Sequence, residues 1–390
     1  MQGSFRHFNW LMFVSMLALV ATGTVAIWSA GNARAETVFH GMWKANLATA
    51  FVGLAVYFAL AFTDYRRLLE WAATPAYIVA VIMLVAVLLF GSKVYGGRRW
   101  LWFFQPSEVS KLCIICMLAR LFGDEGRRSF KWFALAILLV AVPIGLILLE
   151  PDLGTALTLA PAVLLMLFVA RIWRKGLLTI LAIGATVAFA VLGAVYEAEK
   201  PGVTEARREQ ILKWVPLKSH QLSRVKVFLF PEDDITGAGY TLRQAKISIG
   251  SGGFSGKGIG KGESNHLKYL PQSISMNDFI FCVYAEETGF VGSLVLLLMF
   301  GALIVPGAWT AVVATDGSGK LIALGVSTLV FAHVWTNIAM SIGLVPITGL
   351  PLPFISSGRT FLMTVMAGLG LIQSVSIHGR ETKNEPVRMA

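Results

Sequence analysis

Apolar stretches of about 17 to 25 residues alternate with short polar segments along almost the whole chain. A helix needs this length to cross the hydrocarbon core of a bilayer, because each residue adds only about 1.5 Å of rise. We expect ten such helices, at residues 10–29, 44–62, 72–91, 105–122, 131–149, 154–170, 177–196, 277–305, 320–343 and 355–377. The pattern therefore predicts an all-α polytopic integral membrane protein with about ten transmembrane helices.

The predicted helices leave one long polar segment, residues 197–276, between the seventh and the eighth. Lys and Arg residues are most frequent near those helix ends that share a side with both termini, so we expect the N- and C-termini to be cytoplasmic. Residues 197–276 then form an extracytoplasmic loop within a single transmembrane domain that covers residues 1–390. The opening of this loop is expected to be an amphipathic helix that lies along the surface.

Composition agrees with this class: 56% of the residues are hydrophobic, 14% are charged, and the mean hydropathy is +0.69. The net charge of +11 could suggest a nucleic-acid partner. In a membrane protein such an excess is better explained by orientation and by contact with anionic membrane lipid, so we expect no nucleic acid. The three cysteines all fall in apolar stretches, which excludes a disulfide framework or a four-ligand zinc site.

Ionisable residues inside predicted membrane helices are the first candidates for function, because burying a charge in hydrocarbon is costly. Asp278 lies one turn into the eighth predicted helix, directly after a glycine-rich segment. A carboxylate near a helix N-terminus is also favoured by the helix dipole, so a capping role is the structural alternative. Asn277 could cap equally well, and we therefore regard Asp278 as the principal candidate for chemistry.

A second group is the segment QPSEVSK with the preceding GGRRW. Glu108 and Lys111 are three residues apart on one helix face, where they either form a structural ion pair or contact a substrate directly. Arg98 and Arg99 stand at the outer surface, and two guanidinium groups would suit a pyrophosphate.

Two further segments combine charges with helix-breaking residues. EPDLGTA places Asp152 beside a proline between two predicted helices, where irregular backbone must be buried in protein or line a wet cavity. GLVPITGLPLPFISSGRT carries Arg359, for which an outer-leaflet phosphate is one candidate partner.

The glycine-rich segment IGSGGFSGKGIGKG resembles a phosphate cradle in composition, but it has neither a G-K-[ST] ending nor a preceding strand, which excludes a nucleotide P-loop. We expect it to let the backbone approach a bulky ligand, with Lys257 and Lys261 supplying charge. His333, inside the ninth predicted helix, is more often a packing residue than a ligand. The sequence shows no metal-binding motif.

Together these motifs resemble the SEDS family (shape, elongation, division and sporulation), from the first predicted helix to the last. The resemblance rests on RRW with QPSEVSK, EPDLGTA, GAGY with ISIGSGGFSGKG, DFIF with AEETG, and GLVPITGLPLPFIS, in this order. EPDLGTA and PITGLPLP look more like the RodA, cell-elongation branch than the division branch. Two departures are SISMND before Phe279, where a shorter H-T-D is common, and ISSGRTF, where ISYGG is usual.

The resemblance implies a peptidoglycan glycosyltransferase of the bacterial cytoplasmic membrane that polymerises lipid II with a class B penicillin-binding protein as partner. It places the essential aspartate of the family on Asp278 and its cavity pair on Glu108 and Lys111. We expect Asp278 to act as general base at the outer face and the cations to hold the pyrophosphate, with a divalent ion as a further possibility. The alternatives are a transporter that flips the lipid-linked precursor and a scaffold for the penicillin-binding protein.

Overall fold

A computed structural model describes residues 7–379, apart from 33–39, 95–96, 103, 124–128, 151, 201, 216, 235–236 and 264–274. The described chain is almost entirely helical, with one two-stranded antiparallel sheet of β1 (Ser92–Val94) and β2 (Gly97–Trp100). Its long helices are α1 (Trp10–Asn32), α3 (Met42–Phe62), α4 (Tyr65–Phe90), α5 (Pro106–Phe122), α6 (Phe130–Leu149), α7 (Leu153–Val169), α8 (Arg174–Ala198), α14 (Ile280–Val313), α15 (Gly317–Ser341) and α16 (Arg359–His378).

These ten helices coincide with the ten apolar runs, which confirms the predicted polytopic membrane class. Among the described residues, eight helices are long and apolar enough to cross a membrane. The other two, α5 and α7, have 17 residues each. They are shorter because α5 starts at a proline and contains charges, while α7 starts directly after the proline-containing break at residues 150–152.

Helix α4 begins well before its apolar run, at Tyr65 rather than at residue 72. The reason is a cap: the Asp64 carboxylate accepts a hydrogen bond of 3.0 Å from the backbone N–H of Arg66. Two polar turns are thereby added to the apolar segment, which hydropathy alone does not reveal.

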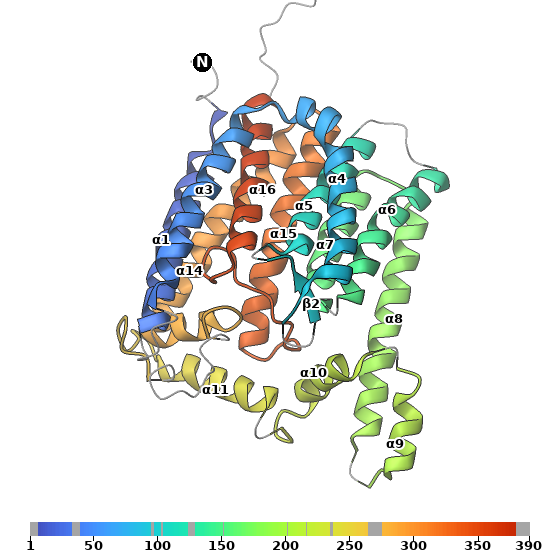
Figure 1. Cartoon of the computed structure of the whole chain (residues 1–390), viewed down its shortest axis with the longest axis vertical. Coiled ribbons are helices and arrows are strands. Elements are labelled where there is room, and N and C mark those ends of the chain that lie inside the picture. The colour runs from blue at the N-terminus through green and yellow to red at the C-terminus, as the bar shows by residue number, and fades with distance from the viewer. Residues whose placement is uncertain are drawn as a thin grey trace, which may run out of the picture.

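The bundle is organised around α15 and α16 (Figure 1). Within their most apolar windows, 94% of the residues of α16 and 67% of those of α15 are buried, against 6% for α8 at the edge. Small residues allow this close packing: a side chain on Gly370 would meet the backbone oxygen of Tyr57 in α3 at 2.7 Å. The buried pair α15 and α16 therefore provides the rigid support on which the outer segments rest.

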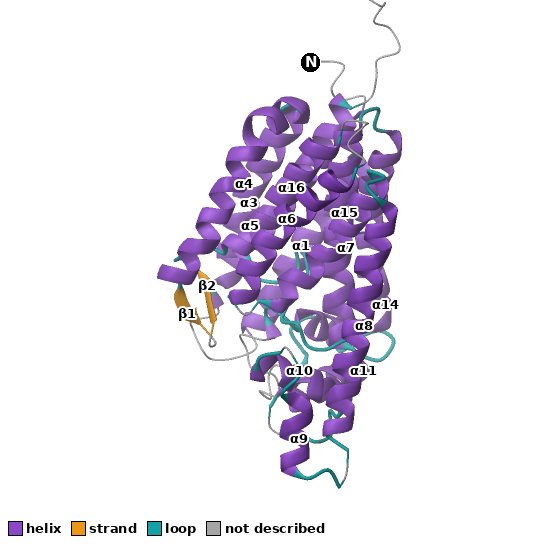
Figure 2. Ribbon diagram, turned by 90° about the vertical axis from the view of Figure 1, so that its right-hand side faces the viewer, coloured by secondary structure: helices purple, strands orange, loops and turns teal. Residues whose placement is uncertain are grey.

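Both described ends of the chain lie at one end of the bundle, where the Ser376 hydroxyl donates a hydrogen bond of 2.7 Å to the backbone oxygen of His7. At the opposite end lie the β-hairpin and three short helices, α9 (Glu205–Leu212), α10 (Ser219–Leu229) and α11 (Ala238–Ser251) (Figures 1 and 2). The termini thus share a side, as the charge pattern predicted, and the long loop occupies the other side.

The opening of the long loop is helical, as expected, but it does not stand alone. Helix α9 lies beside the end of α8, where Arg208 forms an ion pair of 2.7 Å with Glu199. None of the α9 residues is buried. Its predicted association with a membrane surface stays a prediction.

Candidate active site

Asp278 lies in a tight turn that precedes α14, not one turn inside the helix as the hydropathy pattern predicted. Helix α14 begins only at Ile280, because the turn is held by other segments. The side-chain amide of Asn337 in α15 donates hydrogen bonds of 2.8 Å to the backbone oxygen of Asp278 and 2.7 Å to that of Leu350. The hydroxyl of Ser356 donates to the backbone oxygen of Asn277 at 2.5 Å. Asp278 is therefore fixed by the buried helix α15 and by the segment that precedes α16.

Three charged side chains from three distant segments act on Asp278 through their charges: Arg99 from β2, Asp152 from the start of α7 and Arg224 from α10. Burial raises the pKa of the half-buried Asp278 carboxyl to about 6, although the neighbouring Arg224 and Arg99 guanidinium groups lower it and Asp152 raises it. The carboxylate is thus mostly ionised at neutral pH but close enough to its titration range to accept a proton.

Glu150 and Asp152, the described residues between α6 and α7, are buried in protein, which is the condition that the EPDLGTA segment had to meet at membrane depth. Asp152 caps α7: one carboxylate oxygen accepts a hydrogen bond of 3.2 Å from the N–H of Thr155, and the other accepts one of 2.9 Å from its hydroxyl. Arg99 Nε donates to the backbone oxygen of Glu150 at 3.2 Å. Burial and the nearby Asp152 raise the pKa of Glu150 to about 8, against the effect of Arg99, so this carboxyl is mostly neutral at pH 7.

Glu108 and Lys111 form the predicted ion pair, at 2.8 Å between Nζ and Oε2, and both side chains are almost completely buried. Lys111 Nζ also lies 2.8 Å from Nε2 of His333 in α15 and 5.4 Å from the ring centre of Phe361 in α16. Lys111 therefore has an acidic, a polar and an aromatic partner, from three different helices. The arrangement favours the structural alternative, a buried set of contacts that joins α5, α15 and α16.

The remaining predicted cations do not gather around Asp278. Arg98 donates to the backbone oxygens of Leu88 and Leu89 at the end of α4, at 3.1 and 2.8 Å. Lys261 and Arg359 are exposed, the latter at the first position of α16. The other departure from the family pattern, the longer segment before Asp278, falls partly on residues 264–274, outside the described part of the chain.

Lys257 belongs to the glycine-rich segment, and this segment packs against α14 rather than opening towards Asp278. Its ammonium group forms ion pairs with Glu286 at 2.8 Å and with Glu263 at 3.3 Å. The backbone N–H groups of Lys257 and Gly258 donate to the oxygens of Glu286 and Glu287, at 3.0 and 2.9 Å. The glycines thus allow a close approach between two segments of this chain, the glycine-rich segment and α14.

The reason for this close packing is a kink in α14 at Gly289, which has φ of 67° and ψ of −163°. The kink interrupts the internal hydrogen bonds of the helix. The glycine-rich segment supplies replacements: Phe290 N–H donates to the Gly253 oxygen at 2.9 Å and Val291 N–H to the Phe254 oxygen at 3.1 Å. The segment therefore shapes α14, and its expected role beside a ligand stays a prediction.

Sequence reasoning missed Arg224, whereas the expectation that His333 packs inside the protein fits its buried contact with Lys111. Arg224 lies in a loop with several other basic residues and no motif, so nothing in the sequence separates it from them. His333 had a usable signal, since an ionisable residue inside a membrane helix normally has a specific partner.

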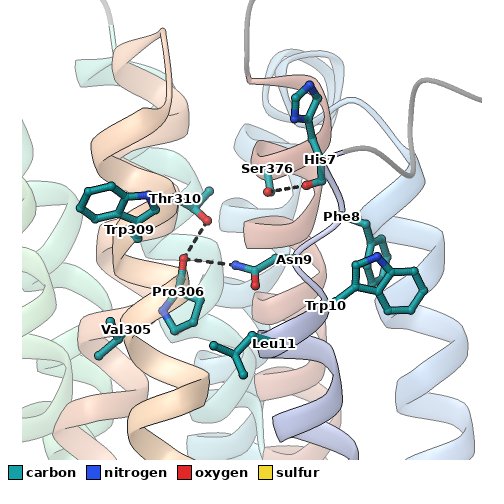
Figure 3. A pocket seen from close by; sticks show the side chains of 10 residues that line it. All are labelled: His7, Phe8, Asn9, Trp10, Leu11, Val305, Pro306, Trp309, Thr310 and Ser376. Carbon is teal, nitrogen blue, oxygen red and sulfur yellow. Dashed lines mark hydrogen bonds between the residues drawn. The ribbon is translucent and has the colours of Figure 1, made fainter.

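A separate pocket lies at the other end of the bundle, where α1, α14 and α16 meet (Figure 3). The side-chain groups drawn there are largely paired with backbone: Asn9 Nδ2 and the Thr310 hydroxyl both donate to the Pro306 oxygen, at 3.3 and 2.9 Å. This pocket is on the side of the termini, away from Asp278, and is not part of the candidate active site.

The residues of the site do not resemble a cation site. Within the described part of the chain, no three or more His, Cys, Asp or Glu side chains come together in a way that could hold a metal ion. The charged groups that act on Asp278 are instead two guanidinium groups, Arg99 and Arg224, and one carboxylate, Asp152. Such a set fits an anionic ligand and a proton acceptor better than a bound cation.

Comparison with known proteins gives a consistent result over nearly the whole chain. A family model for FtsW, RodA and SpoVE, described as cell cycle proteins, matches residues 9–381. The chain is 35% identical over 378 residues to "Peptidoglycan glycosyltransferase MrdB" of Escherichia coli K12, covering 95% of this chain and 94% of that protein. It is 33% identical over 383 residues to the "Probable peptidoglycan glycosyltransferase FtsW" of Trichlorobacter lovleyi, covering 95% and 93%.

Solved structures are similar as well. A chain from a study of polymerisation and crosslinking by a peptidoglycan synthase complex aligns with a TM-score of 0.75 and 29% identity, covering 95% of this chain and 97% of that one. The rod shape determining protein RodA of Thermus thermophilus aligns with a TM-score of 0.64 and 26% identity, covering 96% and 98%. The similarity therefore extends to the fold and includes the segments that form the site.

Proposed function

Because this chain belongs to the FtsW, RodA and SpoVE family of cell cycle proteins, we propose that it is a peptidoglycan glycosyltransferase that polymerises lipid II. One observation carries the mechanism: Asp278 is half-buried, fixed by its backbone, and flanked by Arg99 and Arg224. The acceptor sugar must lose a hydroxyl proton while the donor loses a lipid pyrophosphate. A carboxylate between two guanidinium groups provides for both events.

In this mechanism Asp278 accepts the proton of the acceptor 4-hydroxyl as its oxygen bonds to the anomeric carbon of the donor. The bond from that carbon to the pyrophosphate breaks, and its electron pair stays on the pyrophosphate oxygen. Asp152 positions the start of α7 and the residue before α5, because its carboxylate accepts hydrogen bonds from Thr155 and from Gln105, the latter at 3.4 Å. Glu108 and Lys111 stabilise the packing of the helices that carry the site and do not contact the substrate.

The site faces the outside of the cytoplasmic membrane in this proposal. Basic residues mark the helix ends on the side of the termini, among them Arg66, Arg120, Lys131 and Arg174. Lys and Arg are concentrated on cytoplasmic segments, so the opposite end, with Asp278, is extracytoplasmic. Lipid II presents its sugars at this surface, and the large loop there is accessible to a class B penicillin-binding protein as crosslinking partner during cell elongation.

The relatives favour a transferase over a lipid transporter or a scaffold, since they are named glycosyltransferases. The test is a reconstitution of the purified protein in vesicles that carry fluorescent lipid II on the accessible leaflet, with products separated by gel electrophoresis. Glycan chains support the transferase. Lipid movement without polymer would identify a transporter, and neither activity would leave a scaffold.

A further inference from the structure

Helix α10 of the long loop carries Arg224 into the active site. The helix is held by an ion pair of 2.7 Å between Lys226 and Glu199 and by stacking of Phe230 on Tyr196, with ring centres 5.7 Å apart. Arg224 is half-buried, and its Nη1 donates a hydrogen bond of 2.9 Å to the backbone oxygen of Thr348. The contacts of α10 and the hydrogen bond to Thr348 therefore fix the position of the guanidinium group.

Gly349 shows how close this guanidinium group is to the proposed base. A Cβ atom on Gly349 would stand 3.3 Å from Oδ2 of Asp278 and 3.8 Å from Nη2 of Arg224. The two groups thus face one small space that a glycine leaves open. Gly349 also has φ of +72°, a conformation that favours glycine.

A second cation, Arg99 of β2, acts on Arg224 through its charge. Burial lowers the pKa of Arg224, and the charge of the neighbouring Arg99 lowers it further, while Asp278 and Asp152 oppose this effect. The two guanidinium groups repel each other, and an anion bound by both removes the repulsion. A guanidinium has five N–H donors, and among the described residues Arg224 donates one to Thr348, which leaves donors that can bind such an anion.

On the basis of the proposed glycosyltransferase function, we propose that Arg224 is a catalytic residue that binds the departing lipid pyrophosphate together with Arg99. Of the cations expected from the sequence, Lys257 is paired with Glu286 and Arg98 with the end of α4, so neither serves this purpose. Arg224 takes the place that the sequence assigned to them.

The charges balance through the reaction. Before it, the carboxylates of Asp278 and Asp152 offset the two guanidinium groups. Proton transfer from the acceptor hydroxyl neutralises Asp278 at the moment when the cleaved bond leaves its electron pair, and one more negative charge, on the pyrophosphate. Once Asp278 is neutral, it no longer offsets the positive charge of Arg224. Arg224 therefore attracts the departing pyrophosphate more strongly than it attracted the intact substrate. An interaction that strengthens during the reaction accelerates the chemical step.

Two substitutions separate this role from a purely structural one. Arg224→Gln keeps an N–H donor for Thr348 but removes the charge, whereas Arg224→Lys keeps the charge. We expect Gln to reduce the maximal polymerisation rate roughly 10- to 100-fold with a smaller change in KM, and Lys to lose about tenfold or less. Arg243→Ala is the matched control: this arginine lies on α11 of the same loop, exposed and paired with Glu232, and polymerisation is expected to be unchanged.

Binding of farnesyl pyrophosphate to the detergent-solubilised full chain gives a readout besides activity. We expect Arg224→Gln to weaken it about tenfold or more, and Arg224→Lys about three-fold. If Arg224→Gln does not fold, the affinity of Arg224→Lys for the two ligands tests the proposal instead. A reduced affinity for farnesyl pyrophosphate, with a smaller change for farnesyl monophosphate, supports the proposal, and unchanged affinity for both overturns it.

Equal losses of rate in the Lys and Gln variants, with wild-type affinity for farnesyl pyrophosphate, would show that Arg224 only fastens α10 to Thr348. If Arg224→Gln polymerises at the wild-type rate while Asp278→Asn makes no polymer, this inference fails and the proposed function stands. If the wild-type protein makes no polymer from lipid II, the proposed function itself fails.

Discussion

Replacing Gly289 by alanine tests how α14 is shaped and how the glycine-rich segment packs against it. Gly289 has φ of 67° and ψ of −163°, a combination that residues with a Cβ rarely adopt. A Cβ atom there would also overlap the backbone nitrogen of Gly256, and it would lie 2.7 Å from the oxygen of Phe254. The substitution therefore forces the glycine-rich segment away from α14.

The magnitude follows from these contacts. Holding alanine in this backbone region costs about 1 to 3 kcal/mol. Separating the segment from α14 removes the hydrogen bonds from Phe290 to Gly253 and from Val291 to Phe254, at about 1 kcal/mol each. We expect Gly289→Ala to lower the free energy of unfolding by about 3 to 5 kcal/mol in total.

Gly301→Ala provides the matched control in the same helix. A Cβ atom on Gly301 has no neighbour within 4 Å, and alanine is the better helix former by about 0.5 to 1 kcal/mol. Thermal unfolding of the detergent-solubilised protein, followed by circular dichroism, compares the two variants. An unfolding temperature of Gly289→Ala equal to that of the wild type, or a similar decrease in Gly301→Ala, would refute the reasoning.

Two further predictions concern the site and its support. Because burial raises the pKa of Asp278 to about 6, the ionised base is lost as the pH falls, and polymerisation should drop about tenfold between pH 7 and pH 5; a rate independent of pH over this range would contradict a base at this position. Lys111→Met leaves the buried Glu108 without its cation and should destabilise the protein by about 3 to 5 kcal/mol. The double variant Glu108→Leu, Lys111→Met should unfold at a higher temperature than Lys111→Met alone, and an equal or lower temperature would show that the pair is not coupled.

The architecture could be predicted from the sequence because one physical rule dominates it. Every membrane helix needs a long apolar run, and all ten runs are helices in the structure. Helix ends were less predictable, as α4 shows, because a cap at Asp64 extends the helix into polar residues. Ends depend on single hydrogen bonds, which hydropathy does not detect.

The site was predictable only where a residue type was unusual for its position. Asp278, Glu108 and Lys111 stood out because charges are rare inside apolar helices. Arg224 could not be identified, since its function depends on α10 crossing to the segment at Thr348, a contact between residues 124 positions apart.

The ion pairs of Lys257 could not be predicted for a similar reason. Its partner Glu286 lies on the kinked helix α14, and the kink becomes visible only in the fold. Glycine-rich composition alone does not show whether the close approach involves a ligand or the chain itself.

The central claim is that Asp278 takes the proton of the acceptor sugar, and Asp278→Asn tests it most directly, because asparagine keeps the size of the side chain but cannot serve as base. The measurement is the yield of glycan chains from purified lipid II in vesicles, with Glu205→Gln, an exposed acid on α9, as the control. The account predicts no polymer above background for Asp278→Asn and wild-type polymer for Glu205→Gln. Near-normal chains from a correctly folded Asp278→Asn protein would contradict it.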